Sequence, residues 1–172
     1  MAISESMRVF QDVCDALAVV LTPYGFTYRK SKRVVWRQGA LFEHHVNFGT
    51  SRSVNSLPGH VHLEVTTMAW STALAEYRQL AGIKLPINGA ALFSTTIENI
   101  FQPAPPYVRY DVGDPGTRSE VLAGIANVLR TEVLRVFELV ESPSELRERI
   151  DAGTIPCLVP EAIRDYFACF GK

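Results

Sequence analysis

Apolar residues recur at three- and four-residue spacing in several stretches of the chain, a pattern typical of amphipathic helices. The spacing predicts helices over about residues 4–21, 71–82, 117–140 and 160–170. A further helix is expected to begin after Ser142, because Pro143 follows it directly and Glu145 lies three residues on. The Ser142 hydroxyl can cap the helix, Pro143 is favoured at the first helical position, and the Glu145 carboxylate can accept the backbone N–H of Ser142.

Three shorter segments alternate apolar and polar residues with period two, as half-buried antiparallel strands do. They cover residues 32–38, 40–49 and 60–70. In the first segment, Val34 and Trp36 are expected to face the core, and Arg33 and Arg37 the opposite side.

The order of these elements predicts an α+β fold that forms a single domain over residues 1–172. Prolines and glycines interrupt residues 82–116, where the pattern predicts only an edge strand over residues 107–112. We expect an antiparallel sheet of three or more strands with helices packed on one face. The uncovered face would then carry Arg33, Arg37, His45, His62 and Glu64.

The composition argues against a membrane protein, a disulfide-rich secreted protein and a generally basic nucleic-acid-binding protein. The chain of 172 residues is 47% hydrophobic and 20% charged, as folded globular proteins are, and its net charge of -1 gives no overall attraction to nucleic acid or anionic membrane. No apolar run is long enough to span a membrane, and the first residues lack the basic start of a signal peptide. The three cysteines are widely separated, which favours reduced thiols over disulfides. We therefore expect a cytoplasmic protein.

All four histidines fall between residues 44 and 62. His44 falls on the same side of its strand as Phe42, Val46 and Phe48, so we expect it in the core. Pairing of the two strands about a loop at residues 50–58 would place Asn47 beside His62 and His45 beside Glu64. His60 and His62 share one side of a strand, so a metal-dependent enzyme built on His45, His60, His62 and Glu64 is one alternative. The tight ligand spacings of common zinc sites are missing, and a solvated sheet face collects such residues without a metal. We predict no catalytic residues, no metal and no cofactor.

A basic segment at residues 29–37 contains Arg29, Lys30, Lys32, Arg33 and Arg37 with interleaved aromatic residues. Basic and aromatic side chains together hold phosphates and stack bases, so a nucleic-acid-associated module is a second alternative. No recognised nucleic-acid motif accompanies the segment. An acidic protein partner explains the same charges, because complementary charge also steers protein association.

The order of short motifs resembles a family of small bacterial domains of unknown function. Its members show a helix exit with proline and Gly-Phe, a basic-aromatic strand, a Ser-Arg turn and closing helices. The matching positions here are Leu21, Pro23, Gly25, Phe26, Trp36, Ser51, Arg52, Phe137, Glu138 and residues 142–147. The paired histidines and the strand HVHLEV depart from that pattern. The resemblance implies an accessory or immunity-type protein found beside toxins.

These observations predict a non-catalytic protein-binding module, an immunity or antitoxin-like protein whose partner is a protein such as a toxin. Arginine binds carboxylates through its planar fork and is common at interface hot spots. The contact is expected on the polar sheet face and the loop at residues 50–58, through Arg33, Arg37, His45, Arg52, His62 and Glu64. The pattern does not predict an oligomeric state.

Overall fold

The fold is α+β, as predicted, with five antiparallel strands that pair in chain order. The computed structural model describes residues 4–50, 59–83, 89–100, 109–153, 155 and 157–171. The strands are β1 (Thr27–Arg29), β2 (Val34–Gln38), β3 (Glu43–Gly49), β4 (His62–Trp70) and β5 (Ala91–Thr96). A short strand, β6 (Tyr110–Asp111), pairs with the first residues of β4.

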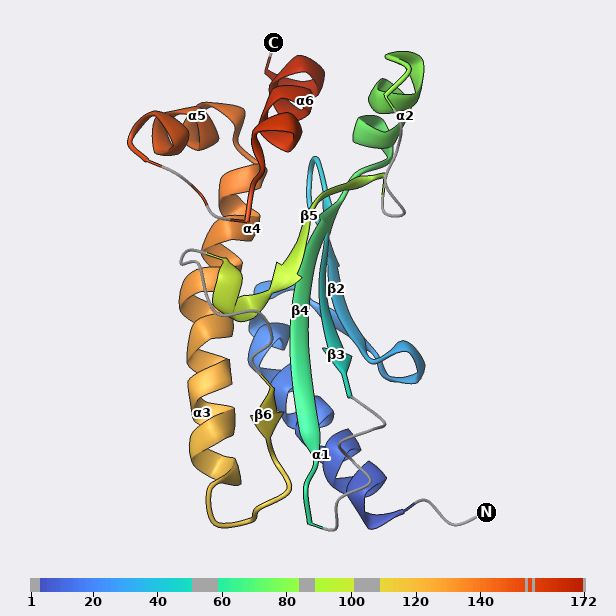
Figure 1. Ribbon diagram of the computed structural model, residues 1–172, viewed down its shortest axis with the longest axis vertical. Helices are drawn as coiled ribbons and strands as arrows, with labels where there is room; N and C mark the ends of the chain where they lie inside the picture. Colours follow the sequence, from blue (N-terminus) through green and yellow to red (C-terminus); the bar gives the residue numbers. More distant parts are fainter. Residues whose placement is uncertain are drawn as a thin grey trace.

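Helices pack against this sheet (Figure 1), except for α5 (Pro143–Asp151), which lies against α4 (Leu134–Val140). The helices are α1 (Glu5–Leu21), α2 (Thr72–Leu80), α3 (Arg118–Val128), α4 (Leu134–Val140), α5 (Pro143–Asp151) and α6 (Pro160–Phe170). A π-helical turn at Leu129–Val133 joins α3 to α4, so the two form one long rod beside the sheet. The side chains of Ser4, Ser71 and Ser142 accept backbone N–H groups at the starts of α1, α2 and α5. None of the helices in the described part of the chain is long and apolar enough to cross a membrane.

The core lies between the sheet and the helices. Phe10 and Leu17 of α1 and Phe137 of α4 are buried against the inward side chains of the central strands, such as Val46 and Leu63. Burying one such side chain contributes about 1.5–3 kcal/mol of hydrophobic free energy. Residues on the other face of β3 and β4 alternate with these and keep part of their surface exposed, so helices cover one face of the sheet.

The faces of β2 are opposite to those predicted. Val35 is fully buried, and because it pairs with Val46 its side chain points to the core. Arg33 and Arg37 share that side, whereas Trp36 points to the uncovered face. Because Val34, Val35 and Trp36 are consecutive apolar residues, the alternation can be read with either Val35 or its two neighbours facing the core. The long arginine stems lie over aromatic rings of the helical side, which lets charged residues flank Val35 there.

The register between β3 and β4 also differs from the prediction. Asn47 pairs with Thr66, and His45 pairs with Met68, so β4 is displaced by four residues from the expected register. The pairing ends at Gly49 and Glu64, which leaves the first residues of β4 free to pair with β6.

The region between α2 and α3 contains more structure than its prolines and glycines indicated. β5 forms there, with a bulge opposite Ala69 and Trp70, and was not predicted. β6 falls within the predicted edge strand at residues 107–112, of which residues 107 and 108 lie outside the described ranges.

Candidate functional site

The uncovered face of the sheet, here called the open face, carries rows of side chains that cross the strands. In the central row Trp36, His45 and Met68 pair across β2, β3 and β4, and Ser94 of β5 completes it. The flanking rows contain Val34, Asn47, Thr66 and Thr96 on one side and Gln38, Glu43 and Trp70 on the other. Both tryptophans of the chain therefore lie on this face.

Trp36 is the best-defined aromatic group of the open face. The guanidinium carbon of Arg29 lies 3.9 Å from its ring centroid, a cation–π contact between neighbouring strands. The indole N–H is buried without a hydrogen-bond acceptor in the described part of the chain. Trp36 was expected in the core, and its place on the open face corrects that prediction.

Carboxylates surround the apolar centre of the open face. His45 Nε2 lies 3.2 Å from Glu43 Oε2, and Glu64 points to the same side of β4. His45, His62 and Glu64 thus lie on the open face, as predicted.

The basic segment at residues 29–37 is largely engaged within the molecule. Lys30 forms an ion pair with Asp15 of α1. Arg33 lies over the Phe10 ring at 5.0 Å, and Arg37 lies over Phe26 at 4.8 Å and donates to the Tyr24 carbonyl. The predicted placement of Arg33 and Arg37 on the open face is therefore wrong.

The loop predicted as part of the contact lies largely outside the described ranges. Residues 51–58, including Arg52, are not described, so the partner-binding role of Arg52 stays a prediction.

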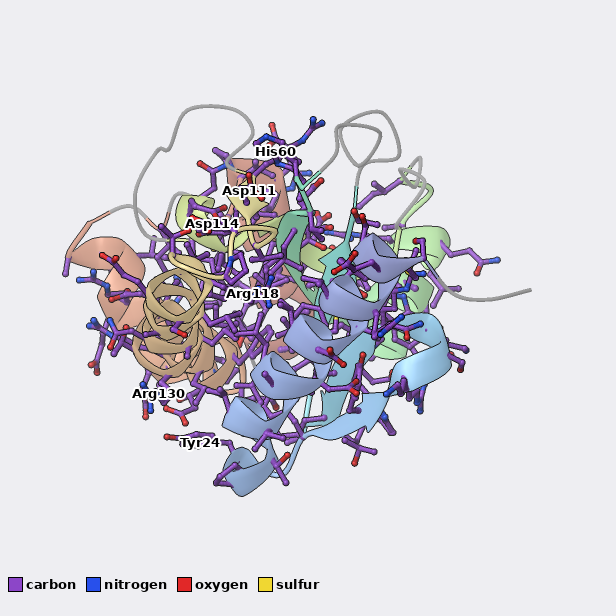
Figure 2. The ribbon with its side chains drawn as sticks, turned by 90° about the horizontal axis from the view of Figure 1, so that it is seen from below. Tyr24, His60, Asp111, Asp114, Arg118 and Arg130 are labelled. Atoms are coloured by element: carbon purple, nitrogen blue, oxygen red, sulfur yellow. The ribbon has the colours of Figure 1, made fainter. Side chains whose placement is uncertain are left out.

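A second group of polar side chains lies where β4 begins. His60, His62 and Asp111 bring one potential metal-ligand atom each to within 4.8 Å of one another. His60 Nδ1 lies 2.5 Å from Asp111 Oδ2, and the imidazoles of His60 and His62 are nearly parallel with centroids 6.2 Å apart. Figure 2 shows His60 beside Asp111, with Asp114 and Arg118 close by.

Hydrogen bonds hold the Asp111 carboxylate in place. Its Oδ1 accepts the N–H groups of Val61, at 3.2 Å, and Gly113, at 2.9 Å. Burial by itself would raise the pKa of the Asp111 carboxyl, but these two hydrogen bonds and the one from His60 outweigh burial and lower it. The carboxylate is therefore ionised near neutral pH.

The segment that carries Asp111 is fixed from both sides. Arg118 of α3 donates to the carbonyls of Val112, at 2.7 Å, and Gly113, at 2.8 Å. Gly113 crosses the chain at Gly59 so closely that a Cβ there would lie 2.1 Å from the Gly59 carbonyl oxygen. Only glycine permits this approach.

The four residues of the alternative metal-dependent site, His45, His60, His62 and Glu64, do not come together. His45 pairs with Met68, six residues along β4 from His62, which corresponds to roughly 20 Å. Glu64 pairs with Gly49 and is not part of the group formed by His60, His62 and Asp111. The prediction missed Asp111, although it lies in the segment expected as an edge strand.

A third polar group is fully enclosed. His44 has no exposed surface, as its core parity predicted, and its ring stacks on Phe137 with centroids 4.4 Å apart. Its Nδ1 lies 3.2 Å from Arg37 Nη2, and its Nε2 contacts Glu141 Oε1 at 2.8 Å without the alignment of a good hydrogen bond. Burial, followed by the charge of Arg37, lowers the pKa of His44 to about 3, so the imidazole is neutral.

Glu141 links this enclosed group to the turn between β2 and β3. Its carboxylate accepts the N–H groups of Leu41, at 2.7 Å, and Phe42, at 3.2 Å. These contacts connect the end of α4 to the hairpin, and we assign the group of Arg37, His44 and Glu141 to structure rather than chemistry.

The cysteines are free thiols. Burial raises the pKa of Cys14 and of Cys157 to about 12 in each case, so both thiols stay protonated and unreactive.

Comparison of the chain with protein-family models, with curated proteins and with solved structures gives no match. The resemblance to a bacterial family of unknown function therefore stays a prediction.

Proposed function

We propose that the protein is a non-catalytic binding module of the immunity or antitoxin type, which contacts a protein partner through the open face of its sheet. The observation that supports this most directly is the position of both tryptophans and Met68 on that face, within a polar surround. Tryptophan, methionine and arginine are enriched at protein interfaces, and aromatic anchors at their centres contribute most of the affinity.

The composition of the face favours a protein over a nucleic acid. Glu43 and Glu64 both lie on it, and carboxylates repel a phosphate backbone. The positive charges of Lys30, Arg33 and Arg37 are directed to partners within the molecule, which weakens the alternative that residues 29–37 hold nucleic acid.

The contact residues of the proposal differ in part from the sequence-based set. His45, His62 and Glu64 stay in it, while Trp36 and Met68 of the central row take the place of Arg33 and Arg37. Within the central row His45 and Met68 lie on β3 and β4, the inner strands of the sheet, and removal of water at the centre of an interface strengthens polar contacts.

Two substitutions test the open face. Ser94→Arg places a long charged side chain at the exposed end of the central row, and Trp36→Ala removes its aromatic anchor. Leu80→Arg is the matched control, because Leu80 is an exposed apolar residue on α2, 89% accessible, away from the sheet.

The experiment begins with affinity capture of the partner from native cells after nuclease treatment. The captured protein is then purified, and the Kd of its complex with the wild-type chain and with each variant is measured by calorimetry. Each open-face variant should weaken the complex by about 30-fold or more, the effect of losing about 2 kcal/mol at an interface hot spot. Leu80→Arg should bind like the wild type. The partner should be toxic alone and neutralised by the wild-type chain.

Three outcomes would overturn the proposal. Capture that disappears with nuclease would favour nucleic acid. A doubled mass in light scattering that Ser94→Arg abolishes would make a second copy of the chain the occupant. A partner that binds both variants with wild-type affinity would place the contact elsewhere.

A further inference from the structure

We propose that His60, His62 and Asp111 form a binding site for a divalent transition-metal ion of the kind that prefers imidazole, with zinc as its representative. The described residues include every His, Cys, Asp and Glu of the chain, and this is the one group of potential ligands that they bring together. The inference rests on these three ligands and not on the proposed protein-binding function, although His62 belongs to both.

The donor set suits such an ion. Imidazole nitrogens together with a carboxylate oxygen bind zinc, cobalt or nickel, whereas calcium and magnesium prefer oxygen ligands alone. The Asp111 carboxylate accepts the N–H groups of Val61 and Gly113, and such hydrogen bonds favour its charged form. Its charge offsets part of the charge of the ion.

The distances allow the three donors to close on one ion. Tetrahedral coordination at about 2.1 Å would place the ligand atoms roughly 3.4 Å apart. The donors of the three residues now lie within 4.8 Å of one another. Binding an ion would therefore break the hydrogen bond between His60 Nδ1 and Asp111 Oδ2, which are 2.5 Å apart, and bring the most distant donors closer by about 1.4 Å.

The support around the site resembles what metal sites require of their surroundings. Asp111 Oδ1 is held by the N–H groups of Val61 and Gly113, which leaves Oδ2 directed at His60. Fixed outer contacts of this kind orient a ligand before the ion arrives. The pairing of β4 with β6 places His62 opposite Asp111, so the backbone itself sets the spacing of two ligands.

The site is open to solvent. The side chains of His60 and Asp111 are 51% and 35% exposed, so an ion can enter without unfolding of the strand. Three protein ligands leave at least one coordination position for water or for a group of another molecule, the arrangement of an open rather than a closed structural site.

Calorimetric titration of the metal-free protein with zinc chloride tests the site. We expect one equivalent to bind, and His62→Ala and Asp111→Asn each to weaken binding at least 10-fold, since even outer-contact substitutions commonly cost that much. Asparagine keeps an oxygen for the N–H groups of Val61 and Gly113, so Asp111→Asn removes the ligand while preserving the turn.

His45→Ala is the matched control, because His45 also lies beside a carboxylate on the open face but has no third ligand. It should bind zinc like the wild type. Cobalt added to the wild type should produce the absorption bands of a bound ion, and His62→Ala should abolish them, which keeps the test decisive if Asp111→Asn folds poorly. No saturable binding, or binding that His62→Ala leaves intact, would overturn the proposal.

Discussion

The buried ion pair between α2 and α6 gives the sharpest prediction of stability. Arg78 Nε donates to Asp165 Oδ2 at 2.9 Å, and the two side chains are only 6% and 5% exposed. The other end of the guanidinium donates to the carbonyls of Gly89 and Ala91, both at 2.9 Å. Asp165→Ala would therefore leave a buried positive charge with carbonyl partners alone.

Removing one member of a buried pair commonly costs 3–5 kcal/mol, because the remaining charge stays uncompensated. The two carbonyl contacts of Arg78 place the expected loss near the lower limit, about 3 kcal/mol. For a chain of this length, that corresponds to a decrease in Tm of roughly 6–12 °C. Asp165→Asn keeps an acceptor oxygen and should cost less than Asp165→Ala.

Arg164→Ala is the matched control, because Arg164 contacts the other oxygen of the same carboxylate at 3.4 Å but is 69% exposed. Its removal should change the free energy of unfolding by less than about 1 kcal/mol, as exposed ion pairs do. Urea unfolding, with equal m-values for all variants, provides the measurement. Equal losses for Arg164→Ala and Asp165→Ala, or no loss for the latter, would refute the reasoning.

Two further predictions concern acid stability and backbone packing. The pKa of His44 is about 3 in the folded state against 6.5 for a free imidazole, so only the unfolded state takes up this proton between those values. Stability should therefore fall by up to about 1.4 kcal/mol per unit as the pH decreases below 6.5, and His44→Gln, but not His45→Gln, should flatten this part of the urea-midpoint profile. Gly113→Ala should cost about 1–3 kcal/mol, because its Cβ would meet the Gly59 carbonyl oxygen at 2.1 Å, whereas Gly124→Ala in α3 meets nothing within 4 Å and should stabilise by about 0.5–1 kcal/mol in the same assay. A pH profile unchanged by His44→Gln, or equal effects of the two alanines, would contradict these expectations.

The helices and the central strands could be predicted because the spacing of their apolar residues is compatible with only one core-facing side for each element. In β3 and β4 most of the large apolar residues before Met68 fall on alternate positions, and the faces of both strands were assigned correctly. In β2 the run Val34, Val35 and Trp36 fits two alternations, and the prediction that placed Val34 and Trp36 together in the core was wrong. The contacts of Arg33 and Arg37 with aromatic rings of the helical side decide between the two alternations, and those rings are distant in the sequence.

The group of His60, His62 and Asp111 shows a different limit. The spacing of His60 and His62 was visible in the sequence, and so was the segment that contains Asp111. Their meeting depends on the register of β4, whose first residues pair with β6 instead of β3. A register is set by the loop and by the facing side chains together, so a displacement of four residues changes the partner of every histidine while it preserves every face.

His62 connects the two proposals, because it lies at the start of β4 on the open face and is also a member of the proposed metal site. Substitution of His62 therefore cannot by itself tell whether lost partner binding reflects the face or the ion. Substitutions of Asp111 and Ser94 distinguish the two proposals. Asp111 lies on β6 and belongs only to the proposed metal site, whereas Ser94 lies on β5 and belongs only to the open face. If Asp111→Asn weakens the complex only when zinc is present, the open coordination position of the ion contributes to the contact. If partner affinity is the same with and without zinc, the aromatic centre of the open face acts alone.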